Sequence, residues 1–151
     1  MKNYTDVTFE YLDKATPGEG AITYEPGYSH ERHKEEIQIA EWIIHTLGGD
    51  ICLIDEKPSV YGARTPDYEW KGRFWELKSL KSDKAVDAAL RKAISQIYER
   101  PGGVILDFGK NQISLSRVES AVKSRVETSC RFRIDVMIIC GGSLSKVIRF
   151  A

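Results

Sequence analysis

The stretch 65–79 carries the residue types of a phosphodiester-cleaving centre. Asp67 precedes Glu76 and Lys78, with a turn signal at Lys71-Gly72 between them. Side chains alternate along a β-strand, so Glu76 and Lys78 point to one face, and a hairpin brings Asp67 beside them. Two carboxylates and an ammonium around one point can bind a divalent cation, orient water and stabilise negative charge on a phosphate. We therefore predict an active-site hairpin here.

The alternative for Glu76 and Lys78 is an ion pair on an exposed sheet face, which contributes less than about 1 kcal/mol. Trp75 and Leu77 alternate with them and are apolar, so the opposite face of the strand is predicted to be buried, with Trp75 in the core. This burial, together with Asp67 on the adjacent strand, favours the functional interpretation.

A helix that precedes the hairpin can supply further polar groups. Ser29 and Gly48-Gly49 predict its limits at about residues 30–47. Its apolar stripe consists of Ile37, Ala40, Ile43, Ile44 and Leu47. One turn further back, Glu36 can complete a metal shell, or is a first-turn acid that complements the helix dipole. His33 is a candidate general acid, general base or ligand, or a solvent-exposed histidine at the helix start.

Other side chains near the hairpin have the types that contact RNA. Gln96 is a candidate for touching the substrate backbone or holding the hairpin carboxylates, or is a surface polar residue. Trp70, Trp75, Tyr68 and Tyr98 are candidates for stacking on an unpaired base, with a core position favoured for Trp75. Basic residues, among which we assign Arg91 and Lys92 to substrate binding, can follow phosphates or form a solvated face. They are Arg64, Lys71, Arg73, Lys78, Lys81, Lys84, Arg91 and Lys92.

The remaining elements must position this hairpin. We predict a buried strand at 50–55, a helix at about 84–99, a parallel strand at 103–108, a helix at about 114–127 and a closing hairpin of 134–140 and 144–150. The order αβββαβαββ indicates a mixed central β-sheet flanked by helices, in the α/β or α+β class. Residues 1–29 are expected to form an irregular lead-in with a short helix near 8–12, followed by a single domain over 30–151.

Composition restricts the function only weakly. A chain of 151 residues with 42% hydrophobic and 29% charged residues is typical of one globular domain. Its formal net charge of zero gives no overall sign of a nucleic-acid partner, although a local basic patch is compatible with it. Cys52, Cys130 and Cys140 lack metal-type spacing and are interpreted as small hydrophobic residues in a reducing compartment. No apolar run is long enough to predict a membrane span.

The order of motifs resembles the PD-(D/E)xK nuclease superfamily, with Pro66-Asp67 and Glu76-Leu77-Lys78 in the motif positions. With His33, Glu36 and Gln96 added, residues 30–150 are similar to the C-terminal tRNase toxin domains of contact-dependent growth inhibition (CdiA-type) proteins. The resemblance implies catalysis by Asp67, Glu76 and Lys78, with His33 assisting. It also implies Mg²⁺ bound by Glu36, Asp67 and Glu76.

The same resemblance implies an endoribonuclease that hydrolyses tRNA in interbacterial competition. Such a domain is delivered as the C-terminal part of a larger secreted toxin, acts in the target-cell cytoplasm and is neutralised by a cognate immunity protein. Three alternatives stay open. They are a metal-independent, barnase-like tRNase in which His33 or Lys78 assists attack by a 2′-hydroxyl, a DNA nuclease, and an inactive module that binds nucleic acid or protein.

Overall fold

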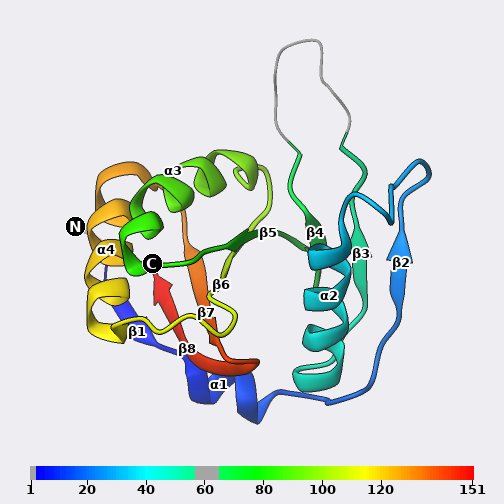
Figure 1. The fold of residues 1–151 in the computed structure, drawn as a ribbon, viewed down its shortest axis with the longest axis horizontal. Helices are drawn as coiled ribbons and strands as arrows, with labels where there is room; N and C mark the ends of the chain where they lie inside the picture. Colours follow the sequence, from blue (N-terminus) through cyan, green and yellow to red (C-terminus); the bar gives the residue numbers. More distant parts are fainter. Residues whose placement is uncertain (1–2, 57–64) are drawn as a thin grey trace.

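The computed structural model describes residues 3–56 and 65–151, so Arg64 and the expected loop at 61–64 lie outside the described residues. Its centre is one mixed sheet of eight strands in the order β1-β8-β7-β6-β5-β4-β3-β2 (Figure 1). The strands are β1 Tyr4–Asp6, β2 Ile22–Tyr24, β3 Ile51–Leu53, β4 Tyr68–Trp70, β5 Arg73–Ser79, β6 Pro101–Asp107, β7 Ile134–Cys140 and β8 Ser143–Phe150. The helices are α1 Thr8–Asp13, α2 Lys34–Thr46, α3 Val86–Gln96, which follows the 3-10 turn η1 Asp83–Ala85, and α4 Leu115–Ser129.

Helices cover the sheet on both faces, which confirms the predicted class. Helices α3 and α4 pack over one face, and α1 and α2 belong to the core on the other (Figure 1). Alternation along β6 shows how one strand serves both cores: Val104 and Leu106 enter the first core, and Ile105 enters the second. A strand covered in this way reads in the sequence as a continuous apolar run.

Both helical crossovers connect parallel strands, as predicted for β6; the parallel pairing of β7 was not predicted. Strand β6 pairs parallel to β5 after α3, and β7 pairs parallel to β6 after α4. The closing hairpin of β7 and β8 is antiparallel, also as predicted. Ser114 begins α4 by accepting a hydrogen bond from Arg117 N at 3.4 Å.

The expectation of an irregular lead-in is wrong for the described residues before 30. Strand β1 pairs antiparallel with β8 and β2 pairs parallel with β3, so this segment supplies strands at the two ends of the sheet. Helix α1 lies where a short helix was predicted. Both strands have three residues and mostly exposed side chains, so they carry no apolar alternation and form only because of partners distant in the sequence.

Helix α2 begins four residues later than predicted. Ser29 Oγ accepts from Arg32 N at 3.4 Å and closes a turn of its own, and His33 takes the N-cap position before Lys34. The buried face also differs slightly, because Ile39 is buried whereas Ile37 and Ile44 are only partly buried.

Cys130 is buried as expected, but Cys52 and Cys140 are only partly buried. Within the described ranges, no helix is both long enough and apolar enough to cross a membrane.

Helix α1 is anchored to the sheet by a buried polar contact. The Tyr11 hydroxyl donates to the carboxylate of Asp135, a side chain that Arg149 also holds through Nε and Nη2 at 2.8 and 3.0 Å. Burial and the charge of Asp135 raise the pKa of Tyr11, so the hydroxyl remains a donor.

Tyr11→Phe is therefore expected to lower the free energy of unfolding by about 1.5–3 kcal/mol, because a buried carboxylate loses one donor. Chemical denaturation measures this loss. Tyr4→Phe is the matched control, since Tyr4 is half exposed and packs on Phe150 through its ring. Equal losses in the two variants would show that the hydroxyl of Tyr11 is not the cause.

Candidate active site

Strands β4 and β5 form the predicted hairpin. Lys71 and Gly72 both have positive φ, 53° and 75°, as a tight two-residue hairpin turn requires. Trp75 and Leu77 are buried on the face that α2 covers, as predicted from alternation. The hairpin thus presents its apolar side to the core and leaves the alternating side chains of β5 for the site.

Asp67 and Glu76 meet where β4 separates from β5. Asp67 N lies 3.1 Å from Trp75 O and 3.1 Å from Glu76 Oε1, and Leu77 N donates to Asp67 Oδ2 at 2.7 Å. Regular pairing with β4 ends at Tyr68. The Asp67 carboxylate therefore accepts the hydrogen bond from Leu77 N that a main-chain oxygen would accept in a continuing ladder. Lys78 Nζ lies 3.4 Å from Glu76 Oε2. The structure brings these three predicted residues together, and because Glu76 is only 3% exposed, they are not a surface ion pair.

Glu36 reaches the same region from the first turn of α2. Its Oε1 accepts from the Tyr28 hydroxyl at 3.1 Å, and its Oε2 lies 2.8 Å from His33 Nδ1. The hydroxyl of Tyr68 donates to the main-chain oxygen of Glu36 at 2.6 Å and fixes this turn against β4. His33 is consequently not the freely exposed histidine of the alternative interpretation.

The carboxylates repel one another. Burial, followed by the charge of Asp67, raises the pKa of Glu36 to about 8 and that of Glu76 to about 9. Burial also raises the pKa of Asp67, although the hydrogen bonds to Glu76 and to the Leu77 amide and the charge of Lys78 oppose the shift. The charge of Asp67 thus raises the pKa of both glutamates, so near neutral pH both favour their protonated forms.

This donor set fits Mg²⁺, which prefers hard oxygen ligands and needs only one or two carboxylates. Asp67 and Glu76 provide them. In the described part of the chain, no three carboxylate, imidazole or thiol groups are gathered closely enough to form a complete metal site. Both oxygens of Glu36 already have partners, Tyr28 and His33, so the predicted set of three ligands is not assembled in this structure.

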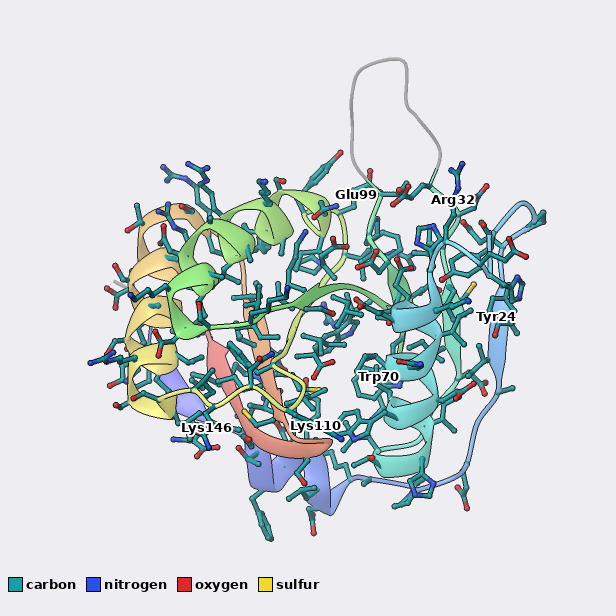
Figure 2. All side chains as sticks on the ribbon, in the orientation of Figure 1. Tyr24, Arg32, Trp70, Glu99, Lys110 and Lys146 are labelled. Carbon is teal, nitrogen blue, oxygen red and sulfur yellow. The ribbon has the colours of Figure 1, made fainter. Side chains whose placement is uncertain are left out.

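The prediction that Trp70 stacks on a base is wrong. Trp70 is 1% exposed, and its Nε1 donates to Gly48 O at 3.1 Å. Tyr68 is also fully buried, whereas Tyr98 is exposed. Trp70 and Tyr68 share a face of β4, and that face packs into the core with α2; Figure 2 shows Trp70 beside this helix.

The other predicted substrate residues lie on α3. Arg91 and Lys92 are exposed and free to meet phosphates. Gln96, the last residue of α3, is half-buried, and its Oε1 is buried without a hydrogen-bond partner among the described residues. An unsatisfied buried amide oxygen is costly, so this atom is a candidate acceptor for a bound molecule.

Sequence reasoning missed Tyr28 and the ring cluster around it. The Tyr28 ring lies 5.2 Å from that of His33 and 5.5 Å from that of Tyr24, and Tyr24 packs on His30 at 4.2 Å. Tyr24 and His30 are exposed beside the residues that hold Glu36. The density of aromatic and histidine residues over 24–33 was the available signal, although no motif contains it.

The fold and the site together define a mixed-sheet protein with an acidic, lysine-containing centre at a hairpin. No family model and no curated protein matches the chain. Among solved structures, the chain is similar to one in the "CdiA-CT/CdiI toxin and immunity complex from Burkholderia pseudomallei", with a TM-score of 0.55 and 15% identity. The match covers 83% of this chain and 96% of that chain. At this identity the likeness concerns the fold alone, which is like that of a chain in this toxin and immunity complex.

Proposed function

We propose that this protein is a toxin nuclease of the contact-dependent growth inhibition type, an endoribonuclease that hydrolyses tRNA with the help of a divalent cation. The observation that supports this most is the hydrogen bond from Asp67 N to Glu76 Oε1 at 3.1 Å, with Lys78 Nζ 3.4 Å from Glu76 Oε2. Aspartate, glutamate and lysine in this arrangement match the PD-(D/E)xK motif. The toxin role is supported by the fold neighbour, which is named as part of a toxin and immunity complex.

Each site residue has a role in this proposal. Asp67 and Glu76 hold Mg²⁺, with Glu36 beside them. When bound, the cation lowers the pKa of a water molecule and neutralises charge on the phosphate. Lys78, held by Glu76, orients the attacking water or stabilises developing negative charge. His33, whose Nδ1 is bound to Glu36, keeps its other ring nitrogen for holding or moving a proton.

The substrate proposal rests on exposed groups of α3 and of the residues just after it. Arg91 and Lys92 offer positive charge for RNA phosphates, and the exposed Tyr98 offers a ring for an unpaired base. We further propose that the domain is delivered as the C-terminal part of a larger toxin and acts in the target-cell cytoplasm. A cognate immunity protein would cover the hairpin or this track, and a stable complex that leaves cleavage intact would contradict that partner role.

Incubation of the purified protein with total tRNA, with Mg²⁺ or with a chelator, tests the proposal. We expect discrete fragments that require Mg²⁺ and form about a hundredfold more slowly with Lys78→Ala, because one charge-stabilising group is lost. Lys110→Ala is the matched control, since this exposed lysine lies in the turn after β6, outside the acidic group and outside the basic residues considered for RNA contact.

Other results would select the alternatives. Fragments that persist in chelator and end in cyclic phosphates would indicate the metal-independent mechanism. Cleavage of DNA alone would contradict the RNA substrate. Binding of tRNA without turnover, unchanged in Lys78→Ala, would identify an inactive binding module.

A further inference from the structure

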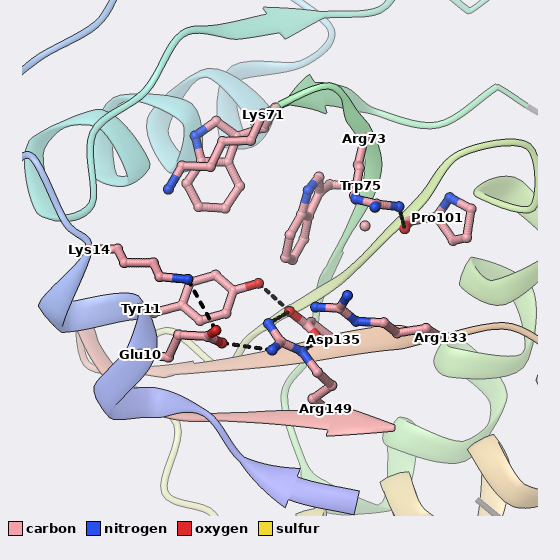
Figure 3. A pocket seen from close by; sticks show the side chains of 12 residues that line it. Glu10, Tyr11, Lys14, Lys71, Arg73, Trp75, Pro101, Arg133, Asp135 and Arg149 are labelled. Atoms are coloured by element: carbon pink, nitrogen blue, oxygen red, sulfur yellow. Dashed lines mark hydrogen bonds and ion pairs between the residues drawn. The ribbon is translucent and has the colours of Figure 1, made fainter. Parts of the chain in front are cut away.

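A separate cavity of about 220 Å³ opens where the parallel strands β5, β6 and β7 begin (Figure 3). Arg73 and Pro101 are the first residues of β5 and β6, and Arg133 directly precedes β7. Helix α1 supplies another wall. Glu36, Asp67 and Glu76 do not line this cavity, so it is distinct from the acidic centre.

The cavity carries a surplus of positive charge. Five cationic and two acidic side chains line it, a surplus of three in a chain whose formal net charge is zero. Both acids are already paired, because Arg149 lies 2.7 Å from Glu10 and 2.8 Å from Asp135. By contrast, Lys71, Arg73 and Arg133 have no carboxylate partner within the described ranges.

A neutral donor adds to these charges. Trp42 and Trp70 donate their indole N–H groups to main-chain oxygens at 2.8 and 3.1 Å, but Trp75 Nε1 has no acceptor in the part of the chain that the structure describes. A Cβ at Gly102, another lining residue, would lie 2.4 Å from Trp75 Nε1. A side chain at position 102 would collide with the indole, so glycine is required there for β6 to pack this closely against Trp75. Figure 3 shows Trp75, Arg73 and Arg133 around one space.

We propose that this cavity binds a phosphate group, either free or carried by a nucleotide chain. Arginine forks and a lysine match the oxygens and the charge of phosphate, and the indole N–H supplies one further donor. The volume is below the roughly 300–1,000 Å³ of sites for drug-sized ligands, so it suits a small anion. A carboxylate from an acidic partner protein is the competing occupant, but its single charge would leave most of the positive surplus uncompensated.

The test follows the three indole N–H resonances by nuclear magnetic resonance while sodium phosphate is added, with sodium chloride at equal ionic strength as reference. We expect a saturable shift that is largest for the Trp75 resonance and absent for Trp42, because Trp70 and Trp75 line the cavity and Trp42 does not. Arg133→Gln should raise the dissociation constant about fivefold or more, since one charged donor is lost. Arg131→Gln, an exposed arginine outside the cavity, should leave it unchanged.

Further titrations of the same resonances use adenosine monophosphate, a short single-stranded RNA in chelator and an acidic peptide. Tighter binding of RNA than of inorganic phosphate would identify a nucleotide chain as the source, and equal binding would identify free phosphate. No saturable shift with phosphate, the same shift with chloride, or a response to the acidic peptide alone would overturn the proposal. These spectra do not depend on cleavage, so the result is independent of the proposed nuclease activity.

Discussion

Glu76→Gln is expected to lower tRNA cleavage by at least about a thousandfold while raising the melting temperature of the same protein. Activity falls because the proposed centre loses a metal ligand and the carboxylate that holds Lys78 at 3.4 Å. Stability rises because the glutamine removes an acid that is 3% exposed and repelled by Asp67. An increase of about 5 °C in chelator is the order expected when one such repulsion is relieved.

This stability gain should depend on pH. The pKa of Glu76 is raised to about 9 in the folded protein from an ordinary value of 4.5. Between these pH values the folded state retains a proton that the unfolded state has lost, so the wild type becomes less stable as pH rises. Glutamine does not titrate in this range, so the variant lacks this loss of stability. The advantage of Glu76→Gln should therefore be small near pH 4 and grow toward pH 9, as melting curves at several pH values would show.

The matched control is Glu69→Gln on the same hairpin. Glu69 is partly exposed and lies 2.7 Å from Arg100, and an exposed pair of this kind contributes little. We expect this variant to keep its activity and to show no stability gain that grows with pH. An active Glu76→Gln variant would contradict the catalytic assignment, and a variant destabilised at pH 8 would contradict the repulsion argument.

The hairpin was predictable because its determinants are local. A turn at Lys71-Gly72 and alternation around Trp75 and Leu77 are sufficient to define the two faces of β5. Helical periodicity likewise predicted α3 and α4, and the crossover that makes β6 parallel to β5 followed from the order of elements. The class of the fold and the meeting of Asp67 with Glu76 therefore did not require knowledge of distant contacts.

The remaining features depend on residues far apart in the sequence. Tyr11 and Asp135 are 124 positions apart, so no local pattern shows that α1 is anchored to β7. The turn at Lys71-Gly72 lies beside the start of β6 only because β5 and β6 pair in parallel. The burial of Trp70 likewise depends on a distant element, because α2 covers that face of β4. The residue type alone had suggested an exposed ring.

Parallel pairing also explains how a chain of zero net charge gathers cations in one cavity, apart from its acidic group. Strands β5, β6 and β7 begin at one edge of the sheet, where the cavity gathers its surplus of three cations. The acidic group lies where β4 leaves β5, with Glu36 added from α2. Net charge averages these regions, so it gave no sign of either one.

The affinity of the protein for Mg²⁺ is expected to rise about a hundredfold between pH 6 and pH 8. The pKa of Glu76 is raised to about 9, so binding of the cation in this range must displace a proton, and each pH unit changes the apparent affinity about tenfold. Calorimetric titration, or the rise in melting temperature on adding Mg²⁺, measures the effect without any cleavage assay.

Asp67→Asn should remove this Mg²⁺ response, because the paired carboxylate that Leu77 N holds at 2.7 Å becomes a neutral amide. Glu35→Gln should retain it, since Glu35 is an exposed first-turn acid of α2 adjacent to Glu36. An affinity that does not vary with pH would show that Glu76 is not the group from which Mg²⁺ displaces a proton. A full response in Asp67→Asn would place the cation elsewhere, and the hairpin carboxylates would then need a metal-independent role.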